Sequence, residues 1–143
     1  MANIVPFAFK GELASGTHNF STSGNTFKIA LYTANPYTTS STTKVATNEV
    51  SSAGGSNYTA GGNTLTGQSV TATTATTAID FADTSWSSAT FTAAFGAIYD
   101  TSASDKLVVV LDFGGDKTAT NGTFTIAFPD PATPSNAIIS ITS

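Results

Sequence analysis

The chain has 143 residues, the length of one ordinary domain and too short for a second hydrophobic core. Only 10% of the residues are charged, 40% are hydrophobic and the formal net charge is -4. Five Lys and no Arg cannot supply the basic patch that phosphate contacts require, so we expect no nucleic-acid partner. No apolar stretch approaches the roughly 20 residues of a membrane span, so we expect no membrane partner. The absence of Cys excludes disulfides and thiolate chemistry.

The first segment, residues 1–22, does not follow the pattern of the rest of the chain. Phe7, Phe9 and Leu13 follow Pro6 at spacings that suit one short helix, although an extended arm would also place them. We predict the short helix.

Beta-branched residues, Gly and Phe dominate the chain, whereas strong helix formers are scarce, and this composition predicts an all-β fold. The clearest strand covers 27–32, where Phe27, Ile29 and Leu31 fall on one face. The segment 35–62 is mostly polar and is predicted to be a long loop with short edge strands around 44–50. We expect this loop to contact a partner.

Later strands are predicted from alternating or continuous apolar residues between turn signals. The strand at 91–99 would place Phe91 and Phe95 on one face. The apolar run at 107–113 would be a central strand that ends at Gly114 and Gly115. The other expected strands are 63–74 with a bulge near Gly67, 77–82 with Asp80 outward, 123–128 and 137–141. About eight short strands predict a single antiparallel β-sandwich domain over 1–143, with a jelly-roll-like arrangement.

The single His residue, His18, is the first candidate for chemistry. A general base needs a nucleophile and an orienting acid to converge on it, and nothing near His18 in the sequence suggests such a set. We therefore predict a structural role, with the ring bonded to a backbone carbonyl near the helix end.

Two carboxylate pairs could in principle form a glycosidase site, namely Asp80 with Asp83 and Asp112 with Asp116. Each pair lies at the end of a predicted strand, where Asp commonly caps a turn. A metal at 100–105 or 112–116 is a minor alternative. We expect no catalytic residue, no cofactor and no metal site, and hence no enzyme.

Three aromatic residues could contact a ligand. Trp86 could stack on a sugar, but we favour burial in the core because large aromatics supply much of the core of small β domains. Tyr37 and Tyr58 lie in polar loops and are predicted to be exposed contact residues. The exterior as a whole is rich in Thr, Ser and Ala, which favours dense assembly, and strand edges without Lys favour coverage in an oligomer.

Five short strings occur in one order along the chain: GTHNF at 16–20, TFKIALYT at 26–33, YTAGGNTLT at 58–66, IDFAD at 79–83 and AIYD at 97–100. In this order they resemble a group of short virion structural proteins of tailed bacteriophages, over residues 7–141. The resemblance implies a capsid decoration (cement) protein or a tail component, located on the virion after synthesis in the host cytoplasm. Cement proteins commonly sit on the capsid exterior as trimers.

The resemblance therefore implies the major capsid protein as partner and a homotrimer as the assembled form. The alternative is a tail or tail-fibre component, including one that binds carbohydrate through Trp86, Tyr37, Tyr58 and Asp side chains. A small hydrolase using Asp80 or Asp112 is the third and least favoured reading. The residues predicted to form the interface are Phe7, Phe9, Tyr37, Thr38, Thr39, Lys44, Asn57 and Tyr58.

Overall fold

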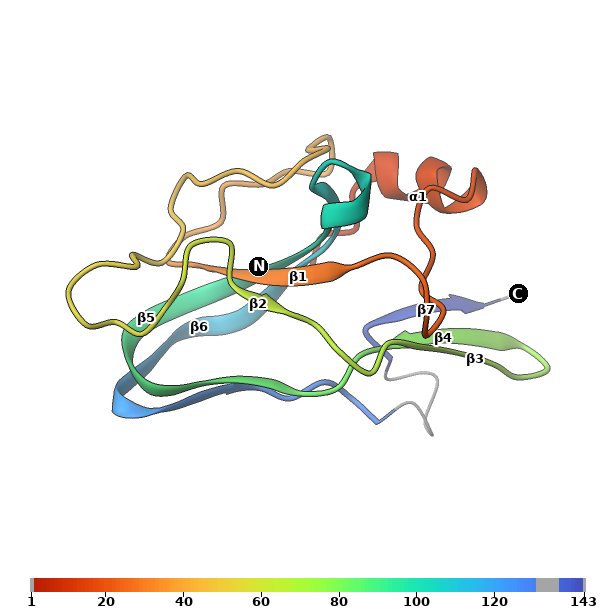
Figure 1. Ribbon diagram of the computed structural model, residues 1–143. Coiled ribbons are helices and arrows are strands. Elements are labelled where there is room, and N and C mark those ends of the chain that lie inside the picture. The colour runs from red at the N-terminus through yellow and green to blue at the C-terminus, as the bar shows by residue number, and fades with distance from the viewer. Residues whose placement is uncertain (1, 131–136, 143) are drawn as a thin grey trace.

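The computed structural model describes residues 2–130 and 137–142, so the predicted domain limits, 1 and 143, lie outside the described residues. It consists of two antiparallel sheets and one short helix, which confirms the all-β class and the helix predicted after Pro6 (Figure 1). The elements are α1 (Phe7–Ala14), β1 (Phe27–Tyr32), β2 (Asn63–Thr64), β3 (Ser69–Ala72), β4 (Thr76–Asp80), β5 (Thr84–Asp100), the 3-10 helix η1 (Thr101–Ala103), β6 (Lys106–Ile126) and β7 (Ile139–Thr142).

The larger sheet has the strand order β2-β1-β5-β6 and the smaller one β3-β4-β7. In Figure 1 the smaller sheet lies to one side of the larger, with the β3–β4 hairpin projecting outward. A two-sheet arrangement is thus present, but these strands do not establish the jelly-roll connectivity that we expected. The predicted strand at 63–74 is divided into β2 and β3, and the interruption falls around Gly67, where a bulge was expected.

Strands β5 and β6 form one long antiparallel hairpin, which is the largest structural unit of the molecule. Four register shifts interrupt its ladder, and such bulges bend a strand and increase its twist. Figure 1 shows the hairpin curving back at the left, so that its two halves contribute to opposite layers. The main core contains residues from both halves and from β1, among them Ile29, Leu31, Trp86, Phe91, Ile98, Val108 and Phe124.

The prediction of a central strand closed by Gly114 was wrong in two respects. Strand β6 continues through Gly114 and Gly115, both at positive φ, and ends only at Ile126. It is also an edge strand of the larger sheet. Residues 107–110 are nevertheless buried in the two hydrophobic clusters, and Ile4 covers part of this edge by exchanging two backbone hydrogen bonds of 2.8 Å with Val110.

The predicted single face of 91–99 was also wrong. A register shift lies between Ala93 and Phe95. Phe91 therefore packs in the main core, whereas Phe95 packs beside Tyr99 in a second cluster on the other side of the sheet. Between the pairs Ala93–Lys117 and Phe95–Asp112, β5 advances two residues and β6 five, and such an irregularity allows the side chains before and after it to point to different sides of the sheet.

The loop 35–62 is exposed over most of its length, but the short edge strands expected within it do not form. No strand forms at 44–50; Glu49 makes only an isolated bridge to Tyr32, and Thr43 makes one to Lys106. The loop is held against the sheet instead by buried side chains, of which Val50 is one.

Gly62 supports a close approach between this loop and β1. Its φ is +74°, and a Cβ at this position would collide with the backbone carbonyl of Ile29. Gly54 has a similar φ of +67° but open space around it.

We predict that Gly62→Ala lowers the free energy of unfolding considerably more than Gly54→Ala. Gly54→Ala carries only the cost of placing Ala in the left-handed backbone conformation, about 1–2 kcal/mol. Gly62→Ala carries this cost and also displaces β1. Urea denaturation of both variants measures the difference, and equal losses would contradict the close approach.

Candidate functional site

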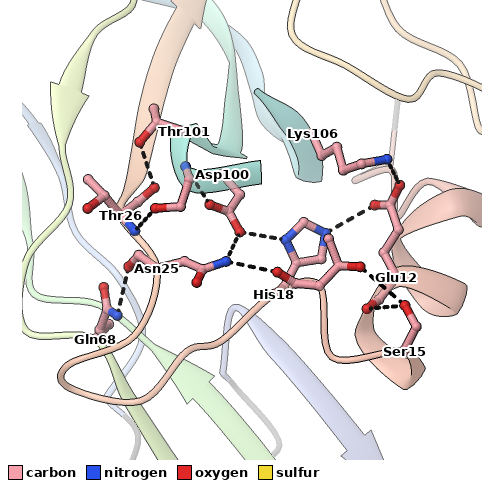
Figure 2. Close-up of polar contacts among 11 residues, drawn as sticks. Glu12, Ser15, His18, Asn25, Thr26, Gln68, Asp100, Thr101 and Lys106 are labelled. Carbon is pink, nitrogen blue, oxygen red and sulfur yellow. Dashed lines mark hydrogen bonds and ion pairs between the residues drawn. The ribbon is translucent and has the colours of Figure 1, made fainter. Parts of the chain in front are cut away.

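A buried polar network surrounds His18 at the end of the molecule that carries α1 (Figure 2). The Nδ1 atom of His18 lies 2.8 Å from Oδ2 of Asp100, and Nε2 lies 3.0 Å from Oε2 of Glu12. The side chains of His18 and Asp100 are both fully buried. Phe9, Phe20 and Phe27 have rings within 6.5 Å of the imidazole, centroid to centroid, so the network sits in an apolar enclosure.

Each carboxylate of the network has further partners. Asp100 accepts hydrogen bonds from Nδ2 of Asn25 at 2.6 Å and from the backbone N–H of Ser102 at 2.9 Å. Glu12 accepts one from Nζ of Lys106 at 2.5 Å. A buried charge is tolerated when it is paired and hydrogen-bonded, and these contacts meet that condition. The network therefore ties α1 to β5, β6 and the segment that leads into β1.

This geometry supports a structural role for His18, as predicted, but with different partners. The expected backbone carbonyl is replaced by two carboxylates, from Glu12 and Asp100. Both ring nitrogens are engaged and the side chain has no exposed surface, so the imidazole has no nitrogen with which to deprotonate a nucleophile. The pairing with Asp100 spans 82 residues of sequence and was not detectable from spacing.

Glu12 makes the network sensitive to acid. Burial alone would raise the pKa of its carboxyl, but the hydrogen bonds from Lys106 and His18 and their positive charge outweigh that effect, and the pKa lies below the usual 4.5. Folding therefore favours the ionised form. The resulting stability is fully present above the unfolded-state pKa and is lost as the pH falls through the lower folded-state pKa.

We predict that Glu12→Gln lowers the free energy of unfolding at pH 7 by about 1.5–3 kcal/mol, the range for hydrogen bonds to charged groups. The difference from wild type should narrow as the pH falls below 4.5, where wild-type Glu12 also becomes protonated. Denaturant titrations of both proteins from pH 7 to below pH 4.5 measure this difference in unfolding free energy, and Asp116→Asn, at an exposed residue, serves as control. A difference that does not change with pH would contradict the electrostatic origin.

The carboxylates of the two predicted pairs lie in different surroundings. Asp112 accepts the backbone N–H of Gly114 at 2.9 Å, a local contact within β6 rather than the turn cap predicted at a strand end, and this bond lowers the pKa of Asp112. Asp83 accepts the backbone N–H of Phe128 at 2.8 Å. Asp80 is 8% exposed rather than outward as predicted, and burial, together with the negative charges of Asp83 and Asp130, raises its pKa despite a hydrogen bond from Phe81.

The three aromatic residues proposed for ligand contact are all buried. Trp86 is 5% exposed, which confirms the expected core position. Tyr37 and Tyr58, at 4% and 3%, contradict the predicted exposure. The hydroxyl of Tyr37 donates to that of Tyr32 at 2.6 Å, and the hydroxyl of Tyr58 donates to Glu49 at 2.9 Å. Their rings are therefore not available for stacking on a sugar.

The predicted interface residues are only partly brought together. Phe9 belongs to α1 and its side chain is buried. Lys44 is half-buried and forms an ion pair of 2.6 Å with Glu49. The side-chain amide of Asn57 donates to the backbone carbonyls of Ser87 and Ser88. Phe9 is therefore not available on the surface and Lys44 is only partly available, whereas Asn57 is exposed.

Phe7, Thr38 and Thr39, by contrast, do meet on the surface. The backbone N–H of Phe7 donates to the carbonyl of Thr39 at 2.9 Å, and all three residues are exposed. Phe7 is 65% exposed, more than any other large hydrophobic residue of the described chain, and Val5 nearby in sequence is 37% exposed. Lys10 lies 5.9 Å from the centre of the Phe7 ring. We call Val5, Phe7, Lys10, Thr38 and Thr39 the Phe7 patch.

A cleft of about 620 Å³ lies along the second half of β6. Its lining is largely apolar, with Phe113 and Phe128 among the larger side chains, and its charged lining residues are Asp112 and Lys117. A glycosidase needs one carboxyl of raised pKa, and the pKa of Asp112 is lowered.

Over residues 2–130 and 137–142, no three His, Asp or Glu side chains gather in a way that could hold a metal ion. Within the same residues, no helix is long and apolar enough to cross a membrane. Comparison of the chain with protein-family models, with curated proteins and with solved structures gave no match.

Proposed function

We propose that this protein is a structural component of a tailed-bacteriophage virion, specifically a capsid decoration protein that binds the outer capsid surface and stabilises contacts between major capsid protein subunits. The observation that carries the proposal is the Phe7 patch. Its large exposed aromatic ring, beside two Thr side chains, has the character of a protein contact rather than of a catalytic site. The order of sequence strings that resembles virion proteins supports the same function.

The way in which the patch is held also favours binding. Phe7 begins α1, and α1 is attached to the sheets through the ion pairs of Glu12 with His18 and Lys106. Thr38 and Thr39 are fixed to it by the bond from the backbone of Phe7. A preorganised surface loses less conformational entropy on binding than a flexible one.

The low charge of the chain is consistent with many copies packed closely on a capsid surface. Two of the five Lys residues, Lys44 and Lys106, are already paired within the molecule with Glu49 and Glu12. A surface rich in Ser and Thr gives up little side-chain entropy on contact. Many weak contacts repeated over a shell add through avidity. A homotrimer on the capsid remains part of the proposal.

The copy number in the virion tests the location. We expect hundreds of copies per particle, in a constant ratio to the major capsid protein, by quantitative gel densitometry of purified virions. A handful of copies would overturn the decoration role and assign the protein to the tail or to one vertex.

The Phe7 patch makes a second prediction. Phe7→Ala should weaken binding to capsids that lack this protein by about tenfold or more, the effect of truncating an aromatic interface anchor. Val45→Ala, at a hydrophobic residue that is 38% exposed outside the patch, serves as control. Co-sedimentation with the capsids measures both variants, and equal binding by the two would exclude the patch as the contact.

A further inference from the structure

The smaller sheet has an apolar face that extends beyond the core. The register pairs Val70 with Ile79 and Ile79 with Ile139, so these three side chains share one face. Ile141 lies two residues further along β7 and therefore points the same way. Ile79 and Ile139 are buried, but Val70 is 50% and Ile141 is 49% exposed.

The outer edge of this sheet is also unprotected. Among the described strands, β7 pairs only with β4, so the other edge of β7 has no strand partner. Neither β3 nor β7 contains a charged residue or Pro, the usual means by which proteins keep edge strands from pairing. The one ionisable residue in the three strands is Asp80, which is 8% exposed.

We propose that β7 pairs antiparallel with β7 of a second copy of this chain, across a twofold axis at Ser140, to give one six-stranded sheet. The sequence Ile139–Ser140–Ile141 reads the same in both directions about Ser140. Twofold pairing at Ser140 therefore sets Ile139 of each copy opposite Ile141 of the other. The axis is perpendicular to the sheet, so all four Ile side chains lie on the same apolar face.

A second copy fits this edge better than a charged partner. The chain carries a net charge of -4, so two copies repel each other over most of their surfaces. The strands of the smaller sheet expose no charged side chain, and here two copies can approach without that repulsion. A strongly basic or acidic partner would find no complementary charge on the same strands. The pairing rests on the geometry of β7 and does not depend on the proposed role in the capsid.

Disulfide trapping tests the pairing directly, because the chain has no Cys. In the proposed dimer the two Ser140 Cα atoms are directly opposed, about 4.5–5.5 Å apart, which a disulfide can span. Thr142 lies on the same side of the strand, but its two copies would be offset by about 13 Å along the strands. Ser140→Cys should therefore form a covalent dimer under mild oxidation, whereas Thr142→Cys should not.

The mass in solution provides an independent measurement. We expect light scattering of the wild type to give an even multiple of the 14.5 kDa chain, which for the proposed homotrimer means two trimers joined through β7. Ile141→Lys should halve the mass by placing a charge at the edge. Val45→Lys, at an exposed hydrophobic residue of the loop 35–62, should leave the mass unchanged.

Two results would overturn the pairing. One is a mass of one or three chains that Ile141→Lys does not alter, with equal trapping of both Cys variants. The other is a monomer in which the β7 amides that point away from β4 are protected from hydrogen exchange, which would place a different segment on this edge. Either result could occur with the decoration role intact, because that role is tested by copy number and by Phe7→Ala.

Discussion

The structure depends on satisfying a set of buried polar groups around His18. A buried carboxylate such as Asp100 is costly unless every oxygen finds a partner, and its partners come from parts of the chain far apart in sequence. The contacts that meet this requirement hold α1 on the sheets. They also bring the start of α1 to the surface where Phe7 is exposed, so that one electrostatic constraint positions both the helix and the proposed contact surface.

A second constraint is the small number of elements available to enclose a core. The hairpin of β5 and β6 supplies side chains to both layers, because its bulges bend it back on itself (Figure 1). The loop 35–62 completes the enclosure, with Tyr58 buried and bonded to the equally well-covered Glu49. Burial raises the pKa of the Tyr58 hydroxyl, so its ionisation is disfavoured. The same holds for Tyr99 of β5, where burial, together with the negative charges of Asp105 and Glu49, raises the pKa to about 12.

The two proposed contacts use different physical properties of the same low-charge exterior. The Phe7 patch offers an aromatic side chain on a fixed helix. Strand β7 offers unpaired backbone groups and an Ile pair that is symmetric about Ser140. Side-chain burial would dominate the first contact and backbone hydrogen bonding the second, so a substitution that affects one should leave the other unchanged.

The sequence by itself determined the all-β class, the helix after Pro6, the strand at 27–32 and the burial of Trp86, because local periodicity and residue size decide these features. Only the tertiary structure decided the rest. The bulge that separates Phe91 from Phe95, the passage of β6 through Gly114 and the partners of His18 all depend on pairing between distant residues. Burial of Tyr37 and Tyr58 was missed for the same reason. A polar loop is buried when distant groups satisfy its hydroxyls, and no local pattern records those partners.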